Sequence, residues 1–265
     1  NSAKLVGVGE SLGAALIRPD ISLVRSCASA WGNLRRFEIG ASHLQWLDDV
    51  GIEHLAAGAR VGNFGLGGMI TYLAPRLDLT DASGQLTGNR LTFENVALGG
   101  GIGLRAGSVE MGVTPKFYSS SFKTDTAPNQ TATGINLDAG MTVRIDVEGT
   151  PGAWVISGEN LLPNGAAYGI GGTEAKPLRR FRMGYGFGRE FVMGTDYLYV
   201  PDGRNSWHIG GEVLIQNVVT PRVGYIYRPN PDPSSFTAGL GLTLGPITGD
   251  YAYALHGAGS VGGAH

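Results

Sequence analysis

The sequence is poor in charged residues and in cysteine. Only 16% of the 265 residues are charged, and 20 basic and 22 acidic residues leave a net charge of −2. Because there is no block of basic residues, we expect no nucleic-acid partner. The single cysteine, Cys27, can form neither an internal disulfide nor a cysteine-rich zinc site, and we interpret it as a buried small side chain.

Long hydrophobic runs are also missing. Glycine, proline or a charged residue interrupts every apolar run before about 20 residues, which excludes a transmembrane helix. The segment from Asn1 to Lys4 lacks the charged and apolar regions of a signal peptide. A membrane-spanning β-strand needs only about 9–11 residues of alternating polarity, so a membrane β-barrel stays open.

Glycine is the residue in excess. The chain has 44 glycines in 265 residues, or one in six, against roughly 7% in ordinary proteins. No collagen-like period accompanies them, and 42% of the residues are hydrophobic. We therefore expect one folded domain rather than a fibrous or disordered chain.

Apolar and polar residues alternate along most of the chain. From Ile135 to Val147 every second residue is apolar, while polar or small residues fill the gaps. Such a period predicts β-strands with one apolar face. A pass along the chain predicts thirteen strands, near 36–46, 50–60, 61–74, 90–106, 108–123, 134–147, 151–161, 178–188, 189–200, 206–216, 219–228, 235–245 and 246–255.

The predicted connections alternate between short turns and longer loops. The longer ones run over 75–88, 124–133, 162–177, 201–205 and 228–235 and from His256 onward. This wiring is typical of an antiparallel up-and-down β-barrel in an outer membrane. The alternative is a soluble β-sandwich, but its polar face would carry more than the four lysines of this chain (Lys4, Lys116, Lys123 and Lys176). Aromatic residues toward the strand ends also favour interfacial girdles.

Thirteen is an odd number, whereas bacterial single-chain barrels close with an even one. We therefore expect 14 strands, the last lying beyond His265 and outside this sequence. Residues 1–35 do not follow the strand pattern, and we predict that they form an N-terminal hatch or plug inside a barrel of residues 36–265. The alternative for this segment is a periplasmic tail.

No catalytic, cofactor-binding or metal-binding motif is predicted, and we do not expect an enzyme. The glycines from Gly7 to Gly13 are spaced one residue too widely for a dinucleotide loop. The histidines show no metal-ligand spacing, and no G-x-S-x-G elbow is present. Acidic pairs such as Asp48-Asp49 and the stretch from Asp78 to Asp81 could bind calcium, although solvated turns explain them equally well.

Two groups of residues are candidates for sites inside the barrel. Eight charged residues are predicted to face the lumen and to pair with one another or with the plug: Glu110, Lys116, Asp138, Arg144, Arg180, Arg182, Arg222 and Arg228. A role in conduction or ligand binding is the alternative for them. The hatch candidates are Arg18, Asp20, Arg25 and Trp31.

Several segments resemble a known family. NVALGGGIGLR from Asn95 to Arg105, followed by VEMGVTPKFY from Val109 to Tyr118, is similar to the central hairpin of the PorV/PorQ outer-membrane proteins, which are relatives of the FadL-type long-chain fatty acid transporters. Further similar stretches are SGENLLP at 157–163, TAGLGL at 237–242 and GDYAY at 249–253. The last is similar to the penultimate strand of the family, and His265 would lie in the loop before the final one.

The resemblance implies a FadL-like barrel of 14 strands in the outer membrane of a diderm bacterium, in contact with outer-membrane lipid. PorV-type members serve the type IX secretion system, so the first hypothesis is a secretion or surface-anchoring barrel that holds an extracellular or secretion-machinery protein through its long loops. The second is a FadL-like transporter of a hydrophobic ligand. A third is a structural anchor for a fibre or surface layer.

Overall fold

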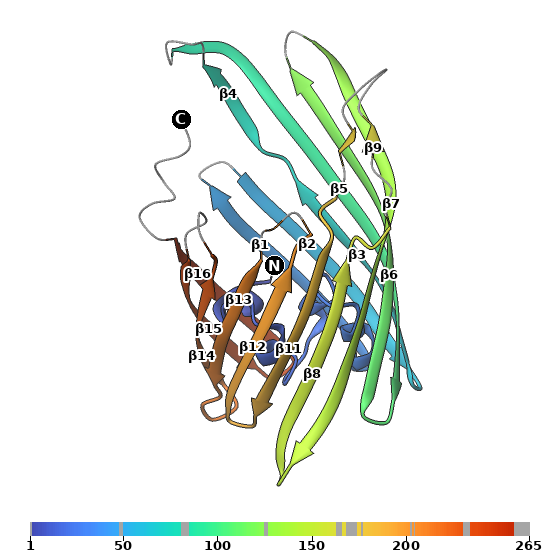
Figure 1. The fold of residues 1–265 in the computed structure, drawn as a ribbon, viewed down its shortest axis with the longest axis vertical. Helices are drawn as coiled ribbons and strands as arrows, with labels where there is room; N and C mark the ends of the chain where they lie inside the picture. The colour runs from blue at the N-terminus through green and yellow to red at the C-terminus, as the bar shows by residue number, and fades with distance from the viewer. Residues whose placement is uncertain are drawn as a thin grey trace.

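The fold is one antiparallel β-sheet curved around the N-terminal segment (Figure 1). The computed structural model describes residues 2–47, 50–80, 85–124, 127–162, 166–167, 174–175, 177–201, 203, 205–229 and 234–256. Along the sheet, each strand pairs with its sequence neighbour, apart from short insertions.

The thirteen predicted strands are confirmed. In sheet order they are β1 (Phe37–Leu47), β2 (Val50–Val61), β3 (Phe64–Leu73), β5 (Leu86–Ala106), β6 (Val109–Thr124), β7 (Ala127–Val147), β8 (Thr150–Glu159), β11 (Arg180–Gly188), β12 (Phe191–Tyr199), β13 (Ser206–Val213), β14 (Val219–Tyr227), β15 (Ser235–Leu244) and β16 (Ile247–His256). Most have 8–12 residues, the length that crosses a bilayer.

Two of the predicted long loops are wrong. Within 75–88 the chain forms β4 (Arg76–Thr80), which pairs with the start of β5, and within 124–133 it has already begun β7. These parts lack the apolar alternation because they belong to a tall extension above the rest of the sheet (Figure 1), where neither face needs to be apolar. A small hairpin of β9 (Ala166–Ala167) and β10 (Glu174–Ala175) lies in the predicted loop 162–177.

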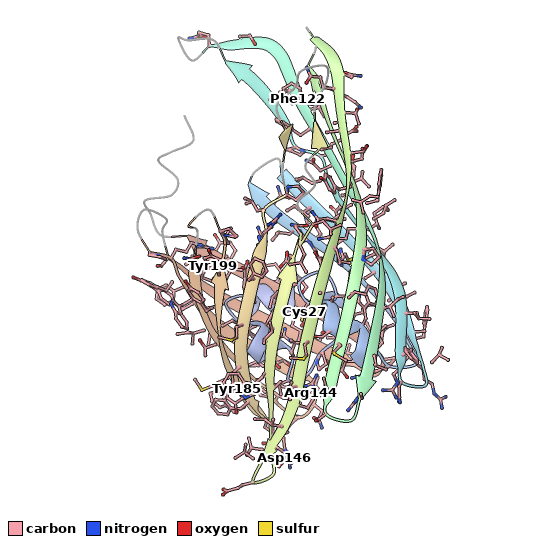
Figure 2. The ribbon with its side chains drawn as sticks, turned by 45° about the vertical axis from the view of Figure 1, so that its right-hand side comes forward. Cys27, Phe122, Arg144, Asp146, Tyr185 and Tyr199 are labelled. Carbon is pink, nitrogen blue, oxygen red and sulfur yellow. The ribbon has the colours of Figure 1, made fainter. Side chains whose placement is uncertain are left out.

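The outer face of the sheet is apolar. Large hydrophobic side chains stand exposed on nearly every strand, including Ile39, Ile102, Ile156 and Leu240. Aromatic side chains cluster at two levels of this face: Tyr185 lies near the end with the short turns and Tyr199 nearer the opposite end (Figure 2). An apolar band between aromatic girdles is the outer surface of a membrane barrel.

Tight turns connect the strands at one end of the sheet. The links β2–β3, β5–β6, β7–β8 and β15–β16 each have two residues. In the β7–β8 turn, Glu148 and Gly149 both have positive φ, of 52° and 79°, as a type I′ turn requires. In outer-membrane barrels this end faces the periplasm.

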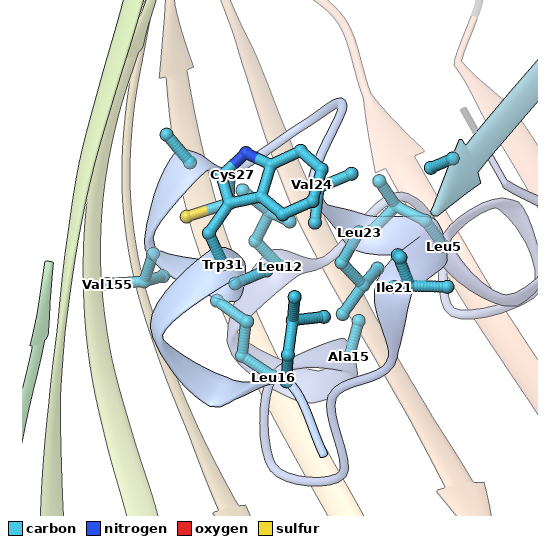
Figure 3. Close-up of a cluster of buried hydrophobic side chains, with 14 of the residues drawn as sticks. Leu5, Leu12, Ala15, Leu16, Ile21, Leu23, Val24, Cys27, Trp31 and Val155 are labelled. Atoms are coloured by element: carbon cyan, nitrogen blue, oxygen red, sulfur yellow. The ribbon is translucent and has the colours of Figure 1, made fainter. Parts of the chain in front are cut away.

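The N-terminal segment lies within the curve of the sheet as a plug. It contains α1 (Ala3–Gly7), α2 (Leu12–Ala15) and two 3-10 helices, η1 (Ile21–Leu23) and η2 (Ala28–Asn33). Its apolar side chains form most of a buried core, in which Trp31, Leu12, Leu16 and Leu23 are completely buried, and Val155 of the wall packs against them (Figure 3). Among the described residues, no helix has the length and apolarity needed to span a bilayer.

The first and last strands of the sheet, β1 and β16, are its two edges. No pairing joins them among the described residues. A cleft of about 720 Å³ lies between β1, β16 and the plug, and Lys4, Asp20 and Glu38 are among its lining residues. The expected fourteenth strand falls outside the described residues.

Candidate functional site: the contacts between plug and barrel wall

The plug turns sharply because short polar side chains cap its helices. The Ser2 hydroxyl accepts a hydrogen bond from the backbone N–H of Leu5 (3.3 Å), and the Ser11 hydroxyl accepts one from Ala14. Asp20 does the same for Ser22 at the start of η1. Each cap satisfies a backbone donor that a helix of this length cannot satisfy itself.

Glycines allow the backbone of the plug to lie directly against the wall. A methyl group at Gly9 would lie 2.6 Å from the carbonyl oxygen of Ile209, and Gly9 also has a φ of 65°. Twelve wall glycines are in the same situation from the other side, since a Cβ on any of them would overlap the plug: Gly40, Gly58, Gly65, Gly67, Gly101, Gly103, Gly112, Gly186, Gly194, Gly210, Gly224 and Gly239. The glycine excess therefore has a location, at the contact between wall and plug.

Asp196 on β12 holds the start of α2. Its carboxylate accepts hydrogen bonds from the backbone N–H groups of Leu12 (2.6 Å) and Gly13 (2.8 Å), and from the Ser11 hydroxyl (3.3 Å). Arg182 on β11 pairs with the same carboxylate (3.3 Å) and donates to the carbonyl oxygen of Glu10. Both charged side chains are almost fully buried, so water solvates neither of them.

A second polar contact joins β6 and β7 to the other half of the plug. Arg144 donates to both carboxylate oxygens of Glu110, at 3.2 and 3.1 Å. A third N–H of Arg144 reaches the carbonyl oxygen of Leu16 (2.6 Å), and Asn33 of the plug donates to Glu110 (3.1 Å). Arg144 and Glu110 thus hold the plug at Leu16 and at Asn33, which are 17 residues apart in sequence.

Glu212 on β13 is shared by one arginine of the wall and one of the plug. Arg222 Nε donates to it at 2.8 Å, and Arg18 Nη2 lies 2.9 Å from its other oxygen. Arg222 also pairs with Asp250 on β16. This chain of charges ties the segment after α2 to the wall strands β13, β14 and β16.

The turn after α1 is held by neutral groups. His208 Nδ1 lies 2.9 Å from the carbonyl oxygen of Gly9. Because a carbonyl oxygen can only accept, Nδ1 carries the proton and donates this hydrogen bond. The other ring nitrogen, Nε2, lies 2.8 Å from the Ser206 hydroxyl. Thr237 on β15 accepts from the N–H of Gly9 (3.0 Å). His208 and Thr237 thus hold the backbone of Gly9 against the wall, at the position where a side chain would not fit.

Around η2, Trp31 fills the space over the wall glycines Gly67 and Gly101 and donates to the Thr114 hydroxyl at 2.9 Å. Ser29 lies 2.7 Å from the Thr142 hydroxyl on β7. Cys27 is buried beside Ser29, and burial raises the pKa of its thiol. The thiol is therefore protonated and poorly reactive while the plug is in place.

The remaining hatch candidates lie at the edges of the plug. Asp20 pairs with Lys4 at 2.9 Å. Arg25 is half-buried, and burial lowers the pKa of its guanidinium, with the charge of Glu159 opposing that effect. Within the described part of the chain, neither Asp20 nor Arg25 forms an ion pair with a residue of the barrel wall.

Four of the predicted lumen residues lie away from these plug contacts. Lys116 pairs with Asp138 at 2.7 Å, and Arg180 lies 3.9 Å from Glu159. Arg228 donates to the Ser235 hydroxyl at 3.0 Å. These residues link wall strands or connecting segments to each other.

Sequence reasoning missed several residues that hold the plug, above all Asp196, His208 and Glu212. Each occupies an inward position of its strand; His208, for example, lies between the exposed apolar side chains of Trp207 and Ile209. The period-two pattern of 189–200 and 206–216 carried that signal. No group of three or more metal-ligating side chains is found in the described part of the chain.

Comparison with known proteins shows similarity in structure alone. No protein-family model matches the sequence, and no curated protein does. The crystal structure of the toluene transporter TodX of Pseudomonas putida is similar with a TM-score of 0.59 and 11% identity, covering 92% of this chain and 89% of that one. The alignment with the crystal structure of OccK8 of Pseudomonas aeruginosa covers 83% of this chain and 92% of that one at 9% identity, but its TM-score of 0.34 is too low to indicate a shared fold. The antiparallel sheet of this chain thus shares its fold with TodX.

Proposed function

We propose that the protein is an outer-membrane transporter for a hydrophobic small molecule in a diderm bacterium, and that the plug is its gate. The observation that carries the proposal is the plug itself, which fills the curve of a FadL-like barrel and is fastened to the wall on several sides. A ligand that crosses this barrel must either displace the plug or pass it after a local rearrangement.

The nature of the contacts supports a movable gate. Most of the apolar core belongs to the plug itself, so most of it would move with the plug, and only Ala56, Met69, Val155 and Val192 of the wall would lose contacts to it. Several of the plug's contacts to the wall are hydrogen bonds and ion pairs, which can be exchanged for water as the plug moves. The fold shared with TodX, a toluene transporter, supports a hydrophobic ligand for this chain.

The competing hypothesis, a PorV/PorQ-type barrel that holds a secretion or surface partner, has no specific observation in its favour. Its proposed contact segments, 124–133 and 162–177, lie partly outside the described residues. Transport is therefore the function that we put to the test, and a protein partner is the alternative outcome.

A reversible lock between plug and wall tests the proposal. Ser29 and Thr142 have hydroxyl oxygens 2.7 Å apart, close to the geometry that a disulfide needs. In the variant C27S/S29C/T142C, oxidation should link η2 to β7. We expect the oxidised protein to lose uptake of radiolabelled toluene or oleate by cells that lack other uptake barrels, and reduction to restore it.

The single variant C27S is the matched control and should be unaffected by oxidant. Restored uptake after reduction excludes misfolding as the cause of the loss. Equal uptake by the oxidised and reduced triple variant would show that the plug is not the gate. If neither probe is taken up by the unmodified protein while a secreted protein copurifies with it, the secretion hypothesis is favoured.

A further inference from the structure

Five arginines surround one cavity at the end of the barrel with the short turns. The cavity has a volume of about 490 Å³ and is lined by Arg18, Arg35, Arg36, Arg60 and Arg105. They come from the plug, from the segment that leaves it, and from the ends of β2 and β5. Backbone hydrogen bonds gather them, since the N–H of Arg60 donates to the carbonyl oxygens of Arg35 (3.1 Å) and Arg36 (3.3 Å).

The three carboxylates near the five arginines of this cavity are each shared with other groups. Glu38 accepts hydrogen bonds from the backbone N–H groups of Arg35 (2.7 Å) and Ile21 (3.0 Å). Glu212 is shared between Arg18 and Arg222. Glu110 lies 3.9 Å from Arg105 and makes its short bonds to Arg144 instead.

Three of the arginines have no side-chain partner in the part of the chain that the structure describes. Within the described ranges, the side chains of Arg35, Arg36 and Arg60 form no hydrogen bond or ion pair. Arg18 Nε is buried without a hydrogen-bond partner. Guanidinium groups left in this way are donors for a phosphate or carboxylate, which they bind through paired N–H groups.

The surroundings place the cavity at a membrane interface. Phe37 follows Arg36 and is 66% exposed, and Val61 follows Arg60 and is 70% exposed. Both apolar side chains belong to the outer band of the barrel, which ends here at the short turns. Basic residues next to a membrane-facing apolar surface lie at the depth of lipid headgroups.

We propose that this arginine cavity binds the phosphate of an anionic phospholipid in the periplasmic leaflet. The bound headgroup joins the end of the plug, through Arg18 and Arg35, to the wall, through Arg60 and Arg105. Such lipid binding stabilises the contact between the plug and the wall at the end with the short turns, and it does not depend on what the barrel transports. Free inorganic phosphate has the same chemistry, so the experiment must separate the two sources.

The test is native mass spectrometry of the full chain in detergent, titrated with phosphatidylglycerol, with phosphatidylcholine or with inorganic phosphate. We expect phosphatidylglycerol to be retained at much lower concentration than phosphatidylcholine. The variant R36Q/R60Q should bind phosphatidylglycerol roughly tenfold more weakly, because two charge-assisted contacts are lost.

The variant R179Q/R189Q is the control, since it removes the same charge from two exposed arginines outside the cavity. In both variants, Cys27 should stay buried and should not react with a maleimide, which shows that the plug is still in place. Equal weakening in the two variants, or none in R36Q/R60Q, overturns the proposal. Tight binding of inorganic phosphate that displaces the lipid also overturns it, in favour of a soluble anion.

Discussion

At the scale of single residues, the barrel wall holds the plug through buried charges whose partners are all supplied by the fold. Asp196 is the clearest case, because three donors of the plug and Arg182 of the wall converge on one carboxylate. Full pairing is what makes such a group tolerable in a closed interior. Removing one member leaves the other charge buried and uncompensated.

The substitution Asp196→Ala should therefore weaken the seating of the plug by about 3 kcal/mol, with Arg182 left unpaired. Hydrogen exchange of the α2 backbone measures this as faster exchange at Leu12 and Gly13. The double variant D196A/R182A should recover part of the loss, because it removes the orphaned charge. Unchanged protection of α2 in Asp196→Ala would contradict the assigned role.

Gly112 on β6 faces the plug at a distance that leaves no space for a side chain. A Cβ there would overlap the carbonyl oxygen of Ala28, next to Cys27. We expect Gly112→Val to displace η2 and to speed maleimide labelling of Cys27 roughly tenfold, since overpacking costs about 1–3 kcal/mol and about 1.4 kcal/mol is a factor of ten. Gly100→Val is the control, because a Cβ at Gly100 meets nothing within 4 Å. Equal labelling of the two variants would argue against a tightly seated plug.

At the scale of elements, the plug is a set of short helices that would not be stable alone. Helices of 4–6 residues are far below the length that persists in water. They are held by caps, by the wall and by bonds such as that of Lys4 in α1 to Asp20 before η1. The order of these elements thus depends on pairs that join segments distant in sequence.

The Lys4–Asp20 pair should make α1 and η1 sensitive to acid. Burial by itself opposes ionisation of Asp20, but the Lys4 ammonium and hydrogen bonds from Ser22 outweigh it, so its pKa lies below the ordinary value. A carboxyl with a lowered folded pKa contributes stability above its unfolded pKa of about 3.9, and this contribution is lost as the pH falls through the folded value.

We therefore expect hydrogen-exchange protection of α1 and η1, corrected for the intrinsic pH dependence, to be constant from pH 7 to about pH 5 and to fall below about pH 4. Asp20→Asn should show the acid behaviour already at pH 7. Protection in Asp20→Asn equal to that of the unmodified protein would mean that the pair does not hold the two helices.

At the scale of the whole molecule, polarity is reversed relative to a water-soluble protein. The outer face of the sheet is apolar, and its inner face carries buried polar residues such as Thr114, Thr142 and His208. Inside that polar lining lies the apolar core of the plug. The molecule therefore has two apolar regions separated by a largely polar shell, and the shell is where the gate proposed above would open.

Much of the barrel could be predicted from the sequence, because strand faces obey a local rule. The run from Ile135 to Val147 alternates since one side meets lipid and the other the lumen, and each residue reports its own side. The prediction was wrong where that rule does not apply: β7 begins at Ala127, in a part of the sheet that extends beyond the apolar band. A strand without an apolar face leaves no periodic signal.

The candidate site was predictable only in part. Arg182 and Glu110 could be placed on the inner register from alternation, but their partners could not. Asp196 meets Leu12 across 184 positions of the chain, and Gly9 meets Thr237 across 228. No local pattern encodes which wall residue faces which turn of the plug.

The sequence by itself therefore determined the strand faces, the thirteen strands along the main path of the sheet and the presence of an N-terminal segment that does not follow the strand pattern. These follow from short-range periodicity and backbone preference. Only the tertiary structure decided how the plug is held, which glycines it lies against and where five arginines converge. Those contacts join residues far apart in the chain, and they exist only once the sheet has curved and set its register.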